Sequence, residues 1–275
     1  MSAHLSAEAI RSFQKNGFCS PIRVYSEVET AELRRQFEAV ETYFGPERAK
    51  RHITDLHLIA DWAWRVVHDP RIVEPISDVL GPNVLLWSLN WFIKEPLDQK
   101  FVSYHQDATY WGLEPHDVAT AWIALSDASE ATGPMKFVSG SHLEEVRYHE
   151  DTFGKDNLLS RGQVIEGDID EEKVVLSPLG AGEMSLHHVR LIHGSTPNQT
   201  TDRRIGMVLR YCATHVRQTK VRDTAVLVRG EDRFGNFDLL PKPEKEFGEV
   251  ELARQRDALV RMQRALHSKD YEDQD

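Results

Sequence analysis

The amino-acid sequence predicts a mainly β protein with flanking helices, whose core is an antiparallel barrel or a double-sheet jelly roll. Near residue 83 the pattern changes from apolar residues at helical spacing to short runs of branched and aromatic residues. Glycine and proline separate these runs, as in the segments 132–134, 177–182 and 196–198. Many short strands divided by such turns are typical of closed or double-sheet β architectures.

Helices are expected over most of residues 6–80. The first helix is expected to begin after Ser6, a favourable N-cap, and to end at Gly17. The second is expected to begin after Ser26. Its apolar residues recur at helical spacing, at Leu33, Phe37 and Val40. Proline-containing breaks on both sides bracket a short helix over 72–80.

The core strands are expected to begin with residues 83–94, which are rich in branched and aromatic residues and have proline on both sides. Further strands are expected at 118–125, 135–138, 174–177, 183–187 and 205–213. The polar stretch 143–172 is expected to be a long loop with one helical turn. With no internal repeat or linker, we expect one domain over 1–275. Its predicted parts are a helical region over about 1–80, a jelly-roll core over about 83–215 and a C-terminal helix over about 250–267.

The composition excludes several classes of protein. A formal net charge of −11 argues against nucleic acid as a general partner, because phosphate binding needs a basic surface, but it allows an anionic small molecule. Cys19 and Cys212 are too few for a disulfide framework and are expected to be reduced and structural. No signal peptide is visible, and no segment approaches the ~20 apolar residues of a membrane span. A cytoplasmic protein without a membrane partner is expected.

Residues of the types that bind metal ions lie at two separate places along the chain. His105 and Asp107 flank Gln106, and His193 and Arg204 follow much later. In a strand, side chains two residues apart share a face, so the imidazole and the carboxylate can point at one position while Gln106 points away. Two histidines and one carboxylate form the ligand set of non-haem Fe(II) oxygenases. The spaced set predicts a metal site.

Several segments occur in the order that is typical of one enzyme family. They are Tyr104-His105-Gln106-Asp107, 121–125, 132–135, 140–142, 182–186 and His193-Gly194-Ser195, with Arg204. Over residues of about 90–211 the chain resembles the phytanoyl-CoA dioxygenase family. That resemblance implies a double-stranded β-helix core of the jelly-roll, cupin-like type. It also implies an enzyme that uses Fe(II), 2-oxoglutarate and O2, with His105, Asp107 and His193 holding the iron.

The resemblance also assigns residues to the cosubstrate. Arg204 would pair with the distal carboxylate of 2-oxoglutarate, because a guanidinium binds a carboxylate through two parallel hydrogen bonds. If Arg204 faces inward, adjacent Arg203 faces outward. Ser195 matches the family serine that binds the same carboxylate. Further cosubstrate contacts are assigned to Asn90, Lys94 and Trp122. Simpler interpretations stay open, since a buried tryptophan packs without a ligand and a lysine before Glu95-Pro96 can be exposed.

Substrate contacts are expected from four residues. Trp111 aligns with an aromatic residue that covers substrate in ectoine hydroxylases, and Tyr110 is its neighbour. Arg210 shares strand parity with Arg204, so it can face the interior and bind an anionic substrate group. His187 has the parity of His193 and can line the same cavity. For Arg210, an ion pair with an internal carboxylate is an equal alternative.

The function implied by the resemblance is hydroxylation of an unactivated C–H bond in a small polar or anionic metabolite, with release of succinate and CO2. Asp107 argues against a halogenase, because in related halogenases chloride replaces the carboxylate. Two alternatives from other classes are a metal-dependent enzyme without the cosubstrate, such as a dioxygenase or isomerase, and a non-catalytic binding or sensing barrel. A small-molecule partner is expected, in a monomer or homodimer.

Overall fold

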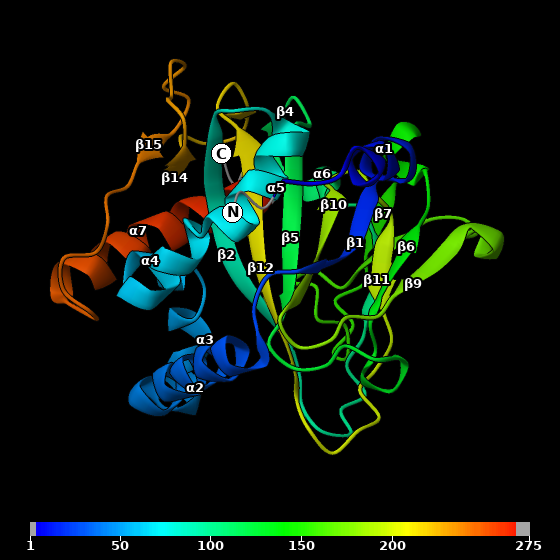
Figure 1. Cartoon of the computed structure of the whole chain (residues 1–275), viewed down its shortest axis with the longest axis horizontal. Coiled ribbons are helices and arrows are strands. Elements are labelled where there is room, and N and C mark those ends of the chain that lie inside the picture. The colour runs from blue at the N-terminus through cyan, green and yellow to red at the C-terminus, as the bar shows by residue number, and fades with distance from the viewer. Residues whose placement is uncertain (1–3, 268–275) are drawn as a thin grey trace.

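Two β-sheets face each other in the computed structural model, which describes residues 4–267 (Figure 1). In this part of the chain the strand order of the larger sheet is β1 (Phe18–Arg23), β10 (Glu183–His188), β5 (Val118–Ala124), β12 (Arg204–Ala213), β2 (Val84–Lys94), β14 (Thr224–Arg229) and β15 (Asp238–Leu239). The order of the smaller sheet is β3 (Val102–His105), β11 (His193–Ser195), β6 (Met135–Val138) and β9 (Val174–Ser177). Neighbours run antiparallel except β14 and β15. The predicted mainly β fold is confirmed.

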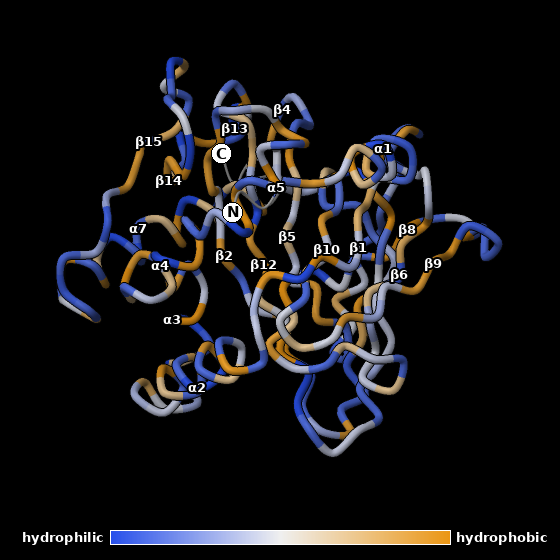
Figure 2. The backbone as a smooth tube through the Cα atoms, in the orientation of Figure 1, coloured by the Kyte–Doolittle hydropathy of each residue, from blue (hydrophilic) through white to orange (hydrophobic). Residues whose placement is uncertain are grey.

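The predicted helix starts are confirmed by their caps. Helix α1 (Ala7–Asn16) begins after Ser6, whose hydroxyl accepts a hydrogen bond from the Ala9 amide. It ends at Gly17, which adopts the left-handed conformation. Helix α2 (Glu27–Phe44) begins with a capping box, in which Ser26 and Glu29 bond each other's backbone amides. The colours of Figure 2 alternate along α2 between hydrophobic and hydrophilic, as expected for a helix with one buried face.

Helices α3 (Pro46–His52), α4 (Asp61–Val67) and α5 (Pro70–Leu80) lie on the same side of the larger sheet as α2 (Figure 1). The turn η1 (Leu56–Leu58) contributes to the same core, while α7 (Glu249–Leu266) packs against η1 and also against Trp111 and its neighbours. The short helix over 72–80 and the C-terminal helix were both predicted and are confirmed as α5 and α7. Tyr211 ties the sheet to α4, because its buried hydroxyl donates to the Val67 carbonyl at 3.0 Å.

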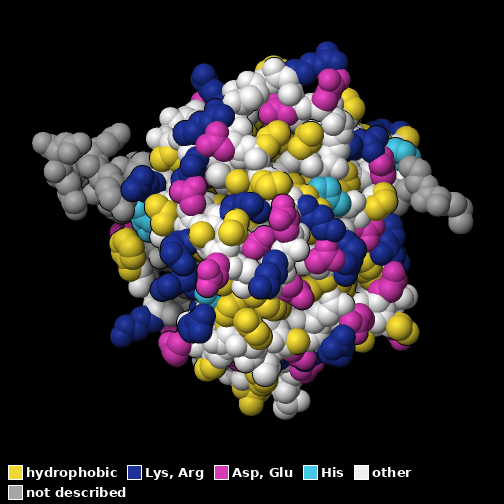
Figure 3. Space-filling view, turned by 90° about the vertical axis from the view of Figure 1, so that its left-hand side faces the viewer, with side chains coloured by type: hydrophobic (Ala, Val, Ile, Leu, Met, Phe, Trp, Pro, Cys, Tyr) yellow, Lys and Arg dark blue, Asp and Glu magenta, His cyan; other side chains and the backbone are white. Residues whose placement is uncertain are grey.

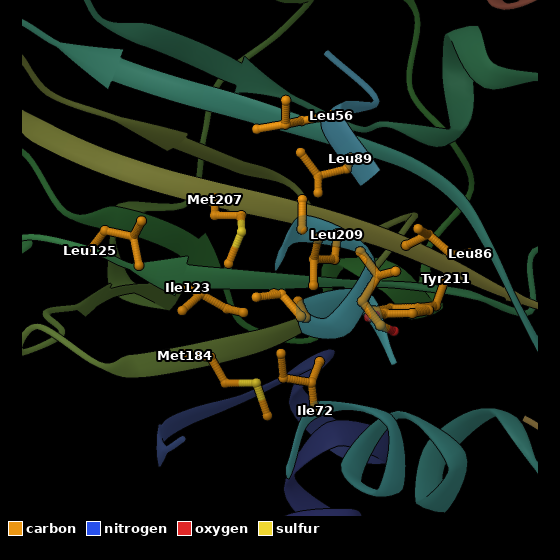
Figure 4. Packing of buried hydrophobic residues seen from close by; sticks show 14 of the residues in the cluster. Leu56, Ile72, Leu86, Leu89, Ile123, Leu125, Met184, Met207, Leu209 and Tyr211 are labelled. Atoms are coloured by element: carbon orange, nitrogen blue, oxygen red, sulfur yellow. The ribbon is translucent and has the colours of Figure 1, made fainter. Parts of the chain in front are cut away.

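The main hydrophobic core fills the space between these helices and the larger sheet (Figure 4). On β12, Met207, Leu209 and Tyr211 belong to this core and are fully buried. Burial of each such side chain contributes roughly 1.5–3 kcal/mol to folding. Since alternate residues of a strand face opposite sides, this core fixes Arg204, Val208 and Arg210 on the other face of the sheet.

The expected strands are confirmed, but several others were not predicted. Strands β2, β5, β6, β9, β10 and β12 lie where expected, to within one residue at each end. Strand β1 lies inside the region expected to be helical and forms the edge of the larger sheet, paired with β10. The stretch 143–172 is not only a loop with a helical turn, since it carries the antiparallel pair β7 (His149–Asp151) and β8 (Gln163–Ile165) before the turn η4 (Glu171–Lys173). A strand of three residues, such as β7 or β8, is too short to show the alternation of apolar and polar residues by which a strand is predicted.

The surface over α2, α4 and α7 carries charges of both signs intermixed with apolar side chains (Figure 3). No single-sign patch dominates this face. Cys19 and Cys212 are both buried and free, as predicted. None of the helices described within residues 4–267 has the length and apolar character to cross a bilayer.

Candidate functional site

Two histidines meet across neighbouring strands of the smaller sheet. Strand β3 ends at His105 and β11 begins at His193, and these residues are direct partners in the antiparallel pair. Side chains opposite each other in such a pair lie close together on one face. The two imidazole ring centres are accordingly 4.1 Å apart, and both residues are buried.

Asp107 reaches the same point, although not from a strand as predicted. Its backbone is helical, with φ −58° and ψ −35°, because it precedes the short helix α6 (Ala108–Trp111). Its Oδ1 lies 3.4 Å from His105 Nε2 and its Oδ2 lies 3.9 Å from His193 Nε2. One ligand atom from each residue lies within 4.8 Å of the others. Gln106 points away, as predicted, and its buried amide donates to the Arg190 carbonyl.

The hydrogen bonds of the two histidines orient their free nitrogens toward Asp107. His105 Nδ1 lies 2.9 Å from the Ser103 carbonyl and His193 Nδ1 lies 2.8 Å from the Leu191 carbonyl. Carbonyl oxygens only accept, so both Nδ1 atoms carry a proton, and in the neutral imidazole each Nε2 presents a lone pair. In that form two imidazole nitrogens and a carboxylate converge as electron-pair donors, which is the arrangement that a metal ion stabilises.

Burial and neighbouring charges favour the ligating forms of His193 and Asp107. Burial holds the pKa of His193 well below its ordinary value, so the imidazole is neutral. For Asp107, burial raises the pKa, but His105, His193 and Arg210 outweigh it and keep that pKa below its ordinary value. A donor set of two neutral imidazoles and one carboxylate suits a divalent transition metal such as Fe(II). The residues present thus fit the ion.

A cavity lies between the two sheets, next to this cluster, and its volume of about 380 Å³ includes space that is open to solvent. Most of the predicted site residues line it: His105, Asp107, Trp122, His187, His193, Ser195, Arg204 and Arg210. The remaining predicted residues, Asn90, Lys94, Tyr110 and Trp111, do not line it. Asn90 lies on β2 opposite Val208, a residue of the cavity wall.

Arg204 lies at one end of the cavity, and no carboxylate of the described residues pairs with it. It is 1% exposed, and its guanidinium carbon lies 5.1 Å from the centre of the Trp122 ring. One terminal nitrogen donates to the Gly133 carbonyl at 2.7 Å, while Nε has no partner. Burial lowers the pKa of Arg204 to about 10, so the side chain stays charged at neutral pH. Arg203 points the other way, as the strand parity requires, and pairs with Glu41 and Glu95.

Lys94 approaches the same end from behind Ser195. It pairs with Arg204 across β2 and β12 and is fully buried, so the interpretation of an exposed lysine was wrong. Its Nζ donates to Ser195 Oγ at 2.6 Å and to the Thr196 carbonyl. Burial, followed by the charge of Arg204, lowers the pKa of Lys94 to about 6. A buried cation, a buried amine that is mostly neutral at neutral pH and a hydroxyl thus gather where an anion can bind.

Arg210 lies at the other end of the cavity. Its guanidinium carbon is 4.5 Å from the centre of the Trp111 ring, and one terminal nitrogen lies 3.3 Å from Ser88 Oγ. Trp111 itself sits behind Arg210 and packs against Trp87. Tyr110 bonds Asp151 on β7 instead of facing the cavity. The predicted direct contact of Trp111 and Tyr110 with substrate does not follow from this geometry.

The remaining cavity residues include some that the sequence did not reveal. His187 was predicted and is buried, with its ring centre 4.8 Å from that of His193. Thr120 was missed, although it shares strand parity with Trp122 and could have been found by that rule. His149 was missed because it lies in the stretch expected to be a loop. Its Nε2 accepts the backbone N–H of Gln106 at 2.9 Å, which braces the turn between two of the clustered residues.

The sequence also matches known proteins. The model of a family described as phytanoyl-CoA dioxygenase (PhyH) matches residues 13–206. A probable alpha-ketoglutarate-dependent hypophosphite dioxygenase from Stutzerimonas stutzeri is 32% identical over 169 residues, which cover 59% of this chain and 57% of that protein. An ectoine dioxygenase from Bordetella parapertussis is 27% identical over 157 residues, covering 52% of this chain and 51% of that protein. The matched regions thus span just over half the length of these curated relatives.

Solved structures match over nearly the whole chain. A non-heme monooxygenase, ThoJ in its apo form, superposes with a TM-score of 0.85 at 32% identity, covering 96% of this chain and 99% of that one. CytC3 with Fe(II) and alpha-ketoglutarate superposes with a TM-score of 0.67 at 21% identity, covering 90% and 97%. The second likeness shows the shared fold alone.

Proposed function

The chain belongs to the phytanoyl-CoA dioxygenase family, and from that premise we propose that it is an Fe(II)- and 2-oxoglutarate-dependent oxygenase. Its proposed reaction is hydroxylation of a C–H bond in a small polar or anionic metabolite, with release of succinate and CO2. The observation that carries the proposal is the convergence of His105, Asp107 and His193 in the same cavity as the unpaired Arg204. The relatives named as alpha-ketoglutarate-dependent support the cosubstrate.

The three converging residues are proposed to hold Fe(II). Three protein ligands leave positions open on an ion that prefers six, which suits a chelating keto acid and O2. When bound, the iron supplies the oxidising power for attack on an unactivated C–H bond. The protein keeps the His193 imidazole neutral through burial, keeps the Asp107 carboxylate ionised, and fixes both rings through the Ser103 and Leu191 carbonyls.

The distal carboxylate of 2-oxoglutarate is proposed to bind Arg204. A buried guanidinium without an ionic partner is costly unless a ligand supplies the opposite charge. Ser195 can donate its hydroxyl to the same carboxylate, and Lys94 holds Ser195 in place through the 2.6 Å hydrogen bond. Trp122 covers one face of the guanidinium, one terminal nitrogen bonds Gly133, and Nε, which has no partner within residues 4–267, is left to donate to the carboxylate.

The relatives that match bear on the size of the substrate. They include proteins named for hypophosphite and for ectoine, which are both small molecules. We therefore propose a metabolite-sized substrate for the cavity next to the cluster. Asp107 occupies the position that a halide would need, which argues against halogenation. The cytoplasmic location and the monomer or homodimer stay predictions.

A turnover screen tests the proposal. The protein is loaded with Fe(II) without oxygen, supplied with 2-oxoglutarate and O2, and assayed for succinate with a panel of amino acids, betaines, phosphonates and small amines. We expect one class of compound to stimulate succinate release, and His105→Ala to abolish it. Substrate oxidation without succinate would instead indicate a cosubstrate-free enzyme. Ligand binding without any turnover would indicate a binding barrel.

A further inference from the structure

A row of polar side chains crosses the inner face of the larger sheet at the end of the cavity away from Arg204. Arg210 on β12 pairs with Ser88 on β2 and with Thr120 on β5, and Thr120 pairs in turn with His187 on β10. The four side chains therefore lie side by side on four neighbouring strands, and we call them the Arg210 row. The row lies six residues along β12 from Arg204, or about 20 Å at the rise of an extended strand.

Three polar atoms of the Arg210 row have no hydrogen-bond partner although they are buried. They are Arg210 Nε, Thr120 Oγ1 and His187 Nδ1. Thr120 and His187 are each 1% exposed, and all but Ser88 line the cavity. Buried polar groups in folded proteins are almost always paired, so a cluster of unpaired ones facing one cavity indicates a missing ligand. That ligand must offer acceptors, because a guanidinium can only donate.

Arg210 also lacks an ionic partner. Within residues 4–267, no carboxylate oxygen lies within 4.0 Å of its guanidinium, so the alternative of an internal ion pair is not realised. The nearest acidic groups that influence it are Asp107 and Asp55. Asp55 is committed elsewhere, since its Oδ1 accepts the Leu89 amide at 2.8 Å. Trp111 covers one face of the guanidinium and leaves its N–H edges for partners in its plane.

The charges of the loaded site leave room for one more anion. Fe(II) contributes two positive charges, Arg204 and Arg210 one each, and Asp107 removes one. The 2-oxoglutarate dianion would remove two more, which leaves a net positive charge of one among these groups; Asp55, whose pKa burial raises to about 7, is only partly ionised at neutral pH and offsets part of it. A buried uncompensated charge is unfavourable, and a monoanionic group at this position would neutralise it.

We propose that the Arg210 row binds a compact oxyanion carried by the substrate, either a carboxylate or a phosphorus oxyanion. Arg210 supplies the charge and Thr120 and His187 supply further hydrogen bonds, so the anion anchors the substrate while its C–H bond faces the metal cluster. This inference rests on the proposed function, because it assigns the substrate class of the same cavity. It predicts that substrates of this protein are acids and that their uncharged amides or esters are not used.

The test measures anion binding to the protein loaded with Fe(II) and saturating 2-oxoglutarate without oxygen. Methylphosphonate, acetate and neutral acetamide are the probes, and tryptophan fluorescence and thermal unfolding are the readouts, since Trp111 touches Arg210. We expect one or both anions to bind and acetamide not to bind. Arg210→Met should raise the Kd of the anion at least about 30-fold, equivalent to about 2 kcal/mol, while the Kd of 2-oxoglutarate changes by no more than about twofold.

Two further variants keep the test decisive. Thr120→Val retains the charge of Arg210 and removes one hydroxyl, so it should raise the Kd of the anion roughly 2- to 10-fold. This variant keeps the test informative if Arg210→Met folds poorly. Arg233→Met makes the same chemical change on a side chain that is 74% exposed and should leave anion binding unchanged. Phosphonate binding without acetate binding would assign a phosphorus oxyanion, and the reverse a carboxylate.

Three results would overturn the inference: no anion binding, equal binding by Arg210→Met, or binding that saturating 2-oxoglutarate removes. The last would place the probe at Arg204. Failure of the proposed function gives a different pattern. In that case 2-oxoglutarate would not bind the unmodified protein, while anion binding would still depend on Arg210.

Discussion

Replacement of Arg204 by methionine should separate stability from function in this protein. Arg204 is buried and has no carboxylate partner within residues 4–267, and burial lowers its pKa well below the ordinary value, to about 10. At 1.36 kcal/mol per pKa unit, holding the charge in the folded protein costs about 3 kcal/mol. The hydrogen bond to Gly133 and the contact with Trp122 recover part of this. Arg204→Met should therefore leave the ligand-free protein as stable as before, or stabilise it by up to about 3 kcal/mol.

The same substitution should remove 2-oxoglutarate binding. Loss of one partner from a desolvated charge pair costs about 2–5 kcal/mol, which corresponds to at least about a 30-fold rise in Kd. Thermal unfolding reads both effects at once. In the unmodified protein with Fe(II), 2-oxoglutarate at 100 times its Kd should raise the free energy of unfolding by about 2.7 kcal/mol and the Tm by roughly 5–10 °C. In Arg204→Met, a Kd at least about 30-fold higher should reduce this stabilisation to about 0.9 kcal/mol or less and the Tm shift to about a third or less.

Arg203→Met is the matched control. It removes the neighbouring arginine, which pairs with Glu41 and Glu95 on the outer face of the sheet. Such partly exposed pairs contribute about 0–1 kcal/mol each, so a small loss of stability with an unchanged Tm shift is expected. The reasoning is refuted if Arg204→Met binds 2-oxoglutarate normally, or if it destabilises the ligand-free protein by several kcal/mol.

Three other predictions concern residues around the site. The pKa of Lys94 is lowered to about 6 in the folded protein. Between about pH 6 and 10 the unfolded chain therefore carries a proton on Lys94 that the folded protein lacks, so the free energy of unfolding should rise with pH in this range. Lys94→Met should reduce that rise by up to about 1.4 kcal/mol per pH unit, as measured by urea unfolding. His149→Ala should weaken Fe(II) binding roughly 10- to 100-fold in calorimetry, because His149 orients the Gln106 turn; unchanged affinity would show that the brace is dispensable. Gly206→Ala should displace Trp122, because the new Cβ would lie 2.0 Å from the Trp122 ring. We expect the free energy of unfolding to fall by about 1–3 kcal/mol and the affinity for 2-oxoglutarate to fall as well. Unchanged stability and unchanged 2-oxoglutarate binding would show that Trp122 is not held tightly against Gly206.

Strand parity and helix capping were the most informative features of the sequence. Parity placed Arg204 and Arg210 on the inner face of β12 and Arg203 on the outer face, because the alternate residues are apolar and pack under the helices. The serine N-caps marked the starts of α1 and α2 correctly. These rules depend only on neighbours in the chain, which is why they could be applied without a structure.

Features that depend on distant contacts could not be predicted. Asp107 was expected on a strand, but where β3 ends depends on its pairing with β11, and the carboxylate reaches the cluster from a helical turn. Lys94 is followed by exposed residues, and its burial is explained by the carbonyls and hydroxyl around Ser195, about a hundred positions away. The role of His149 was hidden because β7 is stabilised by β8 and not by its own sequence.

The most direct test of the central claim is the release of labelled CO2 from 2-oxoglutarate carrying the label at its first carbon. The unmodified protein with one equivalent of Fe(II), a stimulating substrate and O2 should release CO2 and succinate in equal amounts. Asp107→Ala, which removes the carboxylate from the cluster, should release neither above background. Release that needs no Fe(II), or that survives in Asp107→Ala, would contradict the account.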